Sequence, residues 1–252
     1  MPYVSVGSRR VYYSARGQAE GTPVVFIHGA GGNRLVWGGQ LRSLSSAQRV
    51  VALDLPGHGR SDGPGMACIG SYAQVVAEVL GRLGSAAVLV GHSMGGGVAL
   101  HLALQWPGLV AGLVLLGTGG RLRVAPSLLA GLQDDFRCAV AAITGSAFAP
   151  ATASTIRKRG EGALLAAGPA TLLADFRACD AFDVLARLGE IHVPCLVICG
   201  AEDRLTPVKY SEALAKGIPG ARLQVIPSAG HMAMLEEPAA VSQSILSFVS
   251  GL

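Results

Sequence analysis

The stretch "VLVGHSMGGGVAL" places Ser93 between Gly91 and Gly95 at the end of an apolar run. A serine hydroxyl becomes an effective nucleophile only when a base takes its proton, and that base needs an acid to orient it. The G-x-S-x-G spacing is typical of a serine exposed on a sharp turn between a strand and a helix. The pattern predicts a nucleophile at Ser93, provided that a histidine and an acid meet it in the fold.

The residues on either side of Ser93 favour such a turn. Residues 86–91 form an apolar run of strand length, and the small and apolar residues after Ser93 indicate a helix. Glycines beside the serine let the strand and the helix approach closely, and the turn holds the serine in a strained backbone conformation. The N-terminus of the helix would favour negative charge that develops at the same place.

Candidates for the base and the acid follow other predicted strands. His28 in "FIHGAGG" and His231 in "IPSAGHM" both lie where a strand ends, so either could serve as the base. Asp203 in "GAEDRLTP" lies just beyond a strand, and Glu202 beside it competes for the role of the acid. Neighbouring residues point in different directions, so only one of these two carboxylates can face the histidine.

The elements that must position these residues alternate between apolar runs and helical segments. Continuous runs of Val, Leu and Ile are typical of a parallel sheet that is covered on both faces. We therefore expect an α/β fold with a mostly parallel, twisted sheet of about eight strands flanked by helices. The predicted strands are an antiparallel hairpin at 3–6 and 10–15, followed by 22–28, 49–54, 86–91, 112–117, 193–200 and 221–227.

The alternation stops in the middle of the chain. Residues 121–189 contain no good strand candidate and carry apolar residues at helical spacing. We expect a single core domain formed by residues 1–120 and 190–252, interrupted by a helical cap insertion at residues 121–189. The insertion would lie over the carboxyl ends of the strands, where the candidate residues gather.

Five stretches, taken in order, resemble the signatures of the α/β-hydrolase fold superfamily. They are "VVFIHGAGG", "VVALDLPGHGRSD", "VLVGHSMGGGVAL", "VICGAEDRLTP" and "SAGHMAMLEEP". The resemblance implies an α/β-hydrolase fold for everything except the insertion. It implies Ser93 as nucleophile, Asp203 as acid and His231 as base, which is the chain order of this fold.

The same resemblance implies an oxyanion hole beside Ser93. The backbone N–H of Met94, directly after the nucleophile, would be one donor, and the resemblance indicates the N–H of Ala30 as the second, with help from Gly31. His28 would then be a structural residue of the glycine-rich turn.

A serine at this position favours acyl transfer to water, so we expect a serine hydrolase that cleaves a carboxylic ester or lactone of a small, largely apolar substrate. Trp37 and Phe136 are candidates to line the substrate pocket, and Arg121 is a candidate to hold a substrate carboxylate. The alternatives are hydrolysis of C–C bonds in aromatic degradation products, cofactor-free haloperoxidase or perhydrolase chemistry, and a ligand sensor without enzymatic activity.

Composition excludes several other classes. With 50% hydrophobic and 14% charged residues in 252, the chain has material for a large core and is not disordered. A net charge of +4 is too small to indicate nucleic acid or a membrane surface as a partner. No cofactor or metal is predicted, and five cysteines without metal-ligand spacing favour reduced thiols in the cytoplasm. We expect a monomer or homodimer that acts on a small molecule.

Overall fold

The computed structural model describes residues 2–17 and 21–252, and its centre is one eight-stranded sheet with the strand order β1-β2-β4-β3-β5-β6-β7-β8. The strands are β1 (Tyr3–Val6), β2 (Arg9–Arg16), β3 (Val24–Ile27), β4 (Val50–Leu53), β5 (Ala87–His92), β6 (Val110–Leu116), β7 (Cys195–Gly200) and β8 (Arg222–Ile226). The fold predicted from the sequence is confirmed, including the number of strands.

The sheet is antiparallel only at its first edge. β1 pairs with β2 in antiparallel register, as the predicted hairpin requires, and β2 also pairs antiparallel with β4. From β4 to β8 every pairing is parallel. Ile27 at the end of β3 lies opposite Gly91 near the end of β5. The carboxyl ends of the parallel strands therefore meet at one edge, and the candidate residues follow them there.

Helices cover both faces of the sheet because successive side chains of each strand point to opposite faces. Val25 and Ile27 of β3 pack in one core with residues of α2, α3 and α8, whereas Val24 and Phe26 pack in a second core with residues of α1, α9 and α10. These helices are α1 (Gly38–Leu44), α2 (Ile69–Leu83), α3 (Met94–Gln105), α8 (Val208–Gly217), α9 (Ala233–Glu236) and α10 (Pro238–Val249).

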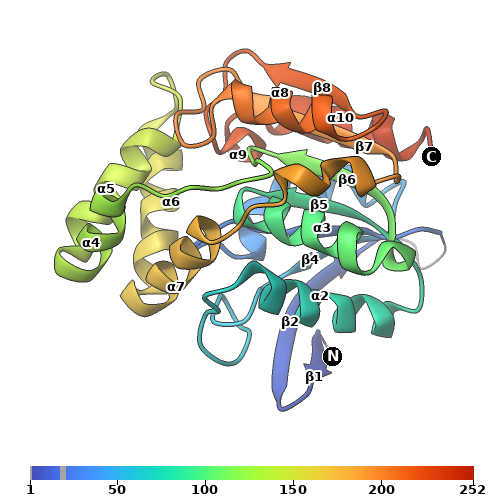
Figure 1. Cartoon of the computed structure of the whole chain (residues 1–252), viewed down its shortest axis with the longest axis horizontal. Helices are drawn as coiled ribbons and strands as arrows, with labels where there is room; N and C mark the ends of the chain where they lie inside the picture. The colour runs from blue at the N-terminus through green and yellow to red at the C-terminus, as the bar shows by residue number, and fades with distance from the viewer. Residues whose placement is uncertain (1, 18–20) are drawn as a thin grey trace.

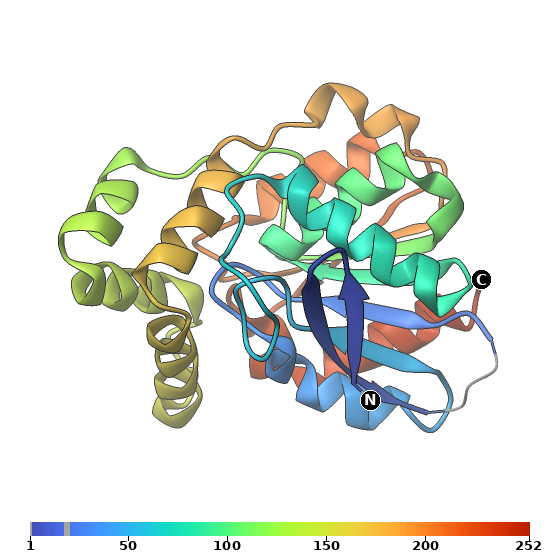
Figure 2. The same cartoon turned by 90° about the horizontal axis from the view of Figure 1, so that it is seen from below.

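Four further helices lie between β6 and β7 in the chain. They are α4 (Pro126–Asp134), α5 (Phe136–Ala147), α6 (Ser154–Ala167) and α7 (Pro169–Asp180). In both views they gather to the left of the sheet, so they form a group at one end of the molecule (Figure 1, Figure 2). Proline opens α4 and α7, where its missing N–H is tolerated.

The segments that join this helical group to the sheet run side by side. Arg121 forms an isolated antiparallel bridge with Asp183, and the N–H of Val184 donates to the carbonyl of Gly120 at 2.7 Å. The chain therefore leaves and re-enters the sheet region at one place. Among the residues that the structure describes, no helix is long and apolar enough to cross a membrane.

Candidate active site

Ser93 lies at the turn between β5 and α3 with φ 52° and ψ −119°. Within residues 2–17 and 21–252 it is the one non-glycine residue with a positive φ, a conformation that side chains with a Cβ avoid. The neighbouring glycines explain how the turn fits. A Cβ at Gly91 would collide with the carbonyl of Gly95, and a Cβ at Gly95 would collide with the carbonyl of Ile27.

Contacts from β6 and the residues after it fix the backbone of this turn. The N–H of Ser93 donates to the carbonyl of Leu116 at 3.0 Å. Thr118 Oγ1 donates to the carbonyl of Ser93 at 2.8 Å. Both polar groups of the Ser93 backbone are thus occupied by the scaffold, and the half-buried side chain faces a cavity.

Asp203 and His231 meet beside this cavity. His231 Nδ1 lies 2.8 Å from Asp203 Oδ2, and the other carboxylate oxygen accepts the N–H groups of Leu205 and Thr206 at 2.9 and 2.8 Å. Burial alone would raise the pKa of Asp203, but the His231 ring and the hydrogen bonds outweigh it and hold the pKa below its usual range. The ionised carboxylate therefore accepts the Nδ1 proton of His231, which leaves Nε2 free to act as a base.

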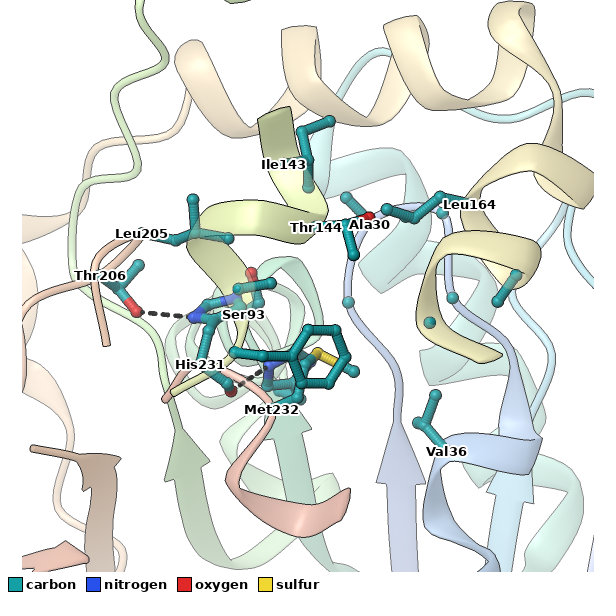
Figure 3. Close-up of a pocket in the computed structure, with 18 of the residues that line it drawn as sticks. Ala30, Val36, Ser93, Ile143, Thr144, Leu164, Leu205, Thr206, His231 and Met232 are labelled. Atoms are coloured by element: carbon teal, nitrogen blue, oxygen red, sulfur yellow. Dashed lines mark hydrogen bonds between the residues drawn. The ribbon is translucent and has the colours of Figure 1, made fainter. Parts of the chain in front are cut away.

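Thr206 is a member of this group that the sequence reasoning missed. Its Oγ1 donates to Asp203 Oδ2 at 2.8 Å. The same oxygen lies 3.2 Å from His231 Nδ1 (Figure 3). The side chain is buried at the end of the "EDRLT" loop, so Asp203 is fixed by hydrogen bonds from within its own turn. Such local partners are typical of an Asx turn, and the Asp-x-x-Thr spacing could have indicated one.

His92, directly before Ser93, also acts on His231. Its Nε2 donates to the carbonyl of His231 at 3.0 Å, and the two rings lie 4.6 Å apart. Burial and the neighbouring His231 ring lower the pKa of His92 to about 3, so the ring stays neutral at ordinary pH. His92 thereby ties the loop of the candidate base to the turn of the candidate nucleophile.

The turn after β3 lies at the same edge of the sheet. His28 is fully buried, with Nδ1 2.8 Å from the carbonyl of Gly29, and its Nε2 accepts the N–H of Leu55 at 3.0 Å. Burial and the nearby His58 ring lower the pKa of His28 well below its usual range. Both ring nitrogens are thus used inside the scaffold, and His28 does not face Ser93 as a second base.

Two backbone donors remain available near Ser93. Ala30 lines the cavity at the turn after β3, and Met94 begins α3 directly after Ser93. Among the described residues, neither backbone N–H has an acceptor within the protein. The side chains of Ser93 and His231 both line the cavity (Figure 3). Among the described residues, no hydrogen bond joins the Ser93 hydroxyl to His231.

The cavity has a volume of about 920 Å³ and mostly apolar walls. Segments that follow β3, β5, β6, β7 and β8 line it together with residues of α4, α5, α6 and α7 of the helical group. Its described lining contains three arginines, Arg123, Arg159 and Arg204, and no aspartate or glutamate. The cavity can therefore enclose a small apolar molecule beside Ser93 and His231.

Three substrate contacts expected from the sequence are wrong. Trp37 is fully buried under the sheet, with its ring 5.0 Å from that of Phe26. Arg121 is exposed and pairs with Asp183 at 3.8 Å. Phe136 packs among the helices α4, α5 and α7. None of the three lines the cavity, whereas Arg123, two residues beyond Arg121, does.

Each of these errors has a physical reason. Trp37 is the last residue of a short 3₁₀ helix, Arg34–Trp37. Its large apolar side chain packs against the sheet because burial there removes it from water. Phe136 begins α5 after Asp135, whose side chain caps the helix by accepting the N–H of Cys138 at 3.0 Å. The apolar residues at helical spacing therefore fall on two separate helices, and their spacing did not reveal this break.

No metal centre is indicated, since no three His, Cys, Asp or Glu side chains within residues 2–17 and 21–252 could hold a metal ion together. Two histidines lie outside the candidate site: His192 is exposed, and His101 is half-buried beside Gly70.

The chain is similar to known hydrolases over almost its whole length. The sequence model described as "Alpha/beta hydrolase family" matches residues 24–244. A putative carbamate hydrolase of Variovorax paradoxus is 32% identical, covering 95% of this chain and 96% of that protein.

Solved structures agree with this similarity. A structure titled as a thermophilic esterase has a TM-score of 0.88 with 35% identity, covering 99% of this chain and 96% of that one. A second structure, Est816, titled as an N-acyl homoserine lactone degrading enzyme, has a TM-score of 0.85 with 32% identity, covering 98% of this chain and 100% of the other.

Proposed function

Because the chain belongs to the alpha/beta hydrolase family and is a hydrolase, we propose that it cleaves a carboxylic ester or lactone of a small, largely apolar substrate. Ser93 is the nucleophile, His231 the base and Asp203 the acid that orients the base. The observation that carries the proposal is the strained turn at Ser93, which faces the same cavity as a His231 ring held by a buried carboxylate.

The geometry supports the following steps. Ser93 Oγ attacks the carbonyl carbon of the substrate while His231 Nε2 takes its proton. The backbone N–H groups of Ala30 and Met94 stabilise the oxyanion of the tetrahedral intermediate. His231 then gives the proton to the leaving alcohol oxygen, and water attacks the acyl-enzyme by the same route. Asp203 stays ionised throughout and stabilises the imidazolium form of His231.

The substrate class rests on the cavity and on the relatives. A cavity of about 920 Å³ with mostly apolar walls suits an acyl chain or a lactone ring with a side chain. The relatives include a protein titled as an esterase and one titled as a lactone-degrading enzyme. Residues 121–189 act as a cap, because α5 and α6 supply part of the cavity wall.

A substrate panel with a Ser93→Ala control tests this function. We expect the wild-type protein to react with a fluorophosphonate probe and to turn over p-nitrophenyl esters or aliphatic lactones many times, and S93A to lose both properties. Undiminished turnover by S93A would refute the role of Ser93. Preferential turnover of a carbamate or a C–C bonded diketone would refute the substrate class, and labelling without repeated turnover would favour a ligand sensor.

A further inference from the structure

Asp175 is a fully buried carboxylate that the steps above leave unused. It lies on α7, in the helical group, and 0% of the residue is exposed. A buried carboxylate is strongly destabilising unless hydrogen bonds compensate for its lost hydration. The hydrogen-bond partners of the Asp175 carboxylate must therefore explain why it is buried here.

The compensation comes from three separate parts of the sheet domain. Asp175 Oδ2 accepts the backbone N–H of Gly31 at 2.8 Å and also lies 2.8 Å from His58 Nε2. The other oxygen, Oδ1, accepts the Tyr72 hydroxyl at 2.6 Å. Gly31 follows β3, His58 follows β4 and Tyr72 is on α2. One side chain of the helical group thus joins three elements of the core.

Gly31 places this network next to the candidate oxyanion hole. Gly31 has φ 62°, and a Cβ there would collide with the methyl groups of Leu164 and Leu172. Its peptide unit directly follows Ala30, and the two peptide planes that flank Ala30 differ only by the φ and ψ of that residue. Fixing the N–H of Gly31 therefore restricts where the N–H of Ala30 can point. Figure 3 shows Ala30 of this turn beside Leu164 of α6.

The charge of His58 makes this arrangement compatible with an oxyanion. His58 Nδ1 lies 3.0 Å from the carbonyl of Pro56, so it must donate there while Nε2 faces Asp175. Burial alone would lower the pKa of His58, but Asp175 outweighs it and the pKa is raised. The imidazolium neutralises the carboxylate, which would otherwise repel negative charge developing at the neighbouring turn.

We infer that Asp175 is a positioning residue: by accepting the N–H of Gly31, it holds the turn after β3 so that the N–H of Ala30 faces the oxyanion. The inference rests on the proposed function, because it assigns Ala30 to the oxyanion hole. It makes the helical group part of the hydrolytic apparatus as well as part of the cavity wall.

Two substitutions of Asp175 and one of Tyr72 test the inference. Asp175→Ala removes the acceptor of the Gly31 N–H and should lower kcat roughly 10- to 100-fold, less than the roughly 100- to 1,000-fold loss of a whole oxyanion donor. We expect KM to change less than about threefold, because substrate binding in the ground state does not use the oxyanion donor. Asp175→Asn retains one carbonyl oxygen and should recover most of kcat.

Tyr72→Phe is the matched control, because it breaks one hydrogen bond of Asp175 and leaves the bond to Gly31. We expect it to lower the melting temperature while kcat per active site, counted by fluorophosphonate titration, stays near the wild-type value. Asp134→Ala, at an exposed acid on α4, should change neither. If Tyr72→Phe loses as much kcat per site as Asp175→Ala, general packing is the cause and the inference is wrong.

Hydrogen exchange separates this inference from the proposed function. In Asp175→Ala the backbone amides of residues 29–33 should exchange faster than in the wild type, whatever reaction the protein catalyses. Unchanged exchange in this turn would refute the inference even if Ser93→Ala abolishes hydrolysis. Faster exchange with no hydrolysis by the wild-type protein would instead refute the proposed function.

Discussion

At Ser93 the backbone itself is strained, since a positive φ with a Cβ is unfavourable by about 1–3 kcal/mol. Gly91 and Gly95 allow this conformation: Gly91 lets β5 approach the start of α3, and Gly95 lets α3 approach the end of β3. The surrounding contacts hold the turn in place, so the strain persists and the Ser93 hydroxyl faces the cavity.

Replacement of Ser93 by glycine and by alanine should separate this strain from the loss of the hydroxyl. Both variants lack the nucleophile and should be inactive. Glycine tolerates the conformation, so we expect S93G to have a free energy of unfolding about 1 kcal/mol higher than S93A, after the greater entropy of unfolded glycine is included. Urea unfolding measures the difference, and equal stabilities would mean that the strain at this turn is no larger than the entropy difference of about 0.4–1 kcal/mol between unfolded glycine and alanine.

The choice between two adjacent carboxylates can be tested in the same way. Asp203→Asn should lower kcat roughly 1,000- to 10,000-fold, because an amide can donate to Nδ1 and favour the wrong tautomer of His231. Glu202→Gln is the matched control: Glu202 is exposed, and its variant should retain wild-type kcat. Steady-state hydrolysis of a p-nitrophenyl ester measures both, and the reverse result would assign the acid to Glu202.

At the scale of elements, α6 should set the length of substrate that the cavity accepts. Ala163 lines the cavity, so Ala163→Phe fills part of it. We expect kcat/KM for p-nitrophenyl octanoate to fall roughly 10- to 100-fold, while that for the acetate changes less than about threefold. Ala166→Phe on the exposed side of α6 is the control. Equal losses for both esters would mean that the acyl chain lies elsewhere.

Most elements were predictable because each strand carries its own burial pattern. The continuous apolar runs around Phe26, Val90 and Val197 predict buried parallel strands, and the structure confirms them. The sequence predicts that residues 121–189 are helical, but it does not predict how these helices pack. Spacing of apolar residues shows which face of a helix is buried, but it does not reveal the partner against which that face packs, as Phe136 demonstrates.

At the scale of the whole molecule, the pair of His58 and Asp175 links α7 of the helical group to the loop after β4. The folded-state pKa of His58 is raised above its unfolded value of about 6.5. The stabilisation is therefore complete below about pH 6.5 and is lost as the pH rises through the folded-state pKa. The charge of Asp54 also raises the pKa of His58, and the Tyr72 hydroxyl, which does not ionise at these pH values, remains a donor to Asp175.

Unfolding experiments at several pH values test this link. The free energy of unfolding of the wild type should exceed that of His58→Gln by a margin that shrinks between pH 6 and pH 9, by about 1.4 kcal/mol for each unit by which the folded-state pKa exceeds the unfolded value. His192→Gln, at an exposed histidine, is the control and should show no such trend. A constant margin for His58→Gln would mean that the pair carries no charge.

The sequence by itself determined the sheet, the turn at Ser93 and the candidates Asp203 and His231, because these depend on local patterns and on where strands end. Only the tertiary structure decided which residues line the cavity and which polar groups meet. Gly31 and Asp175 lie 144 positions apart, and Thr206 and His92 act on His231 through contacts between loops. Local periodicity reports the burial of a side chain, whereas the identity of its partner depends on how distant elements pack together.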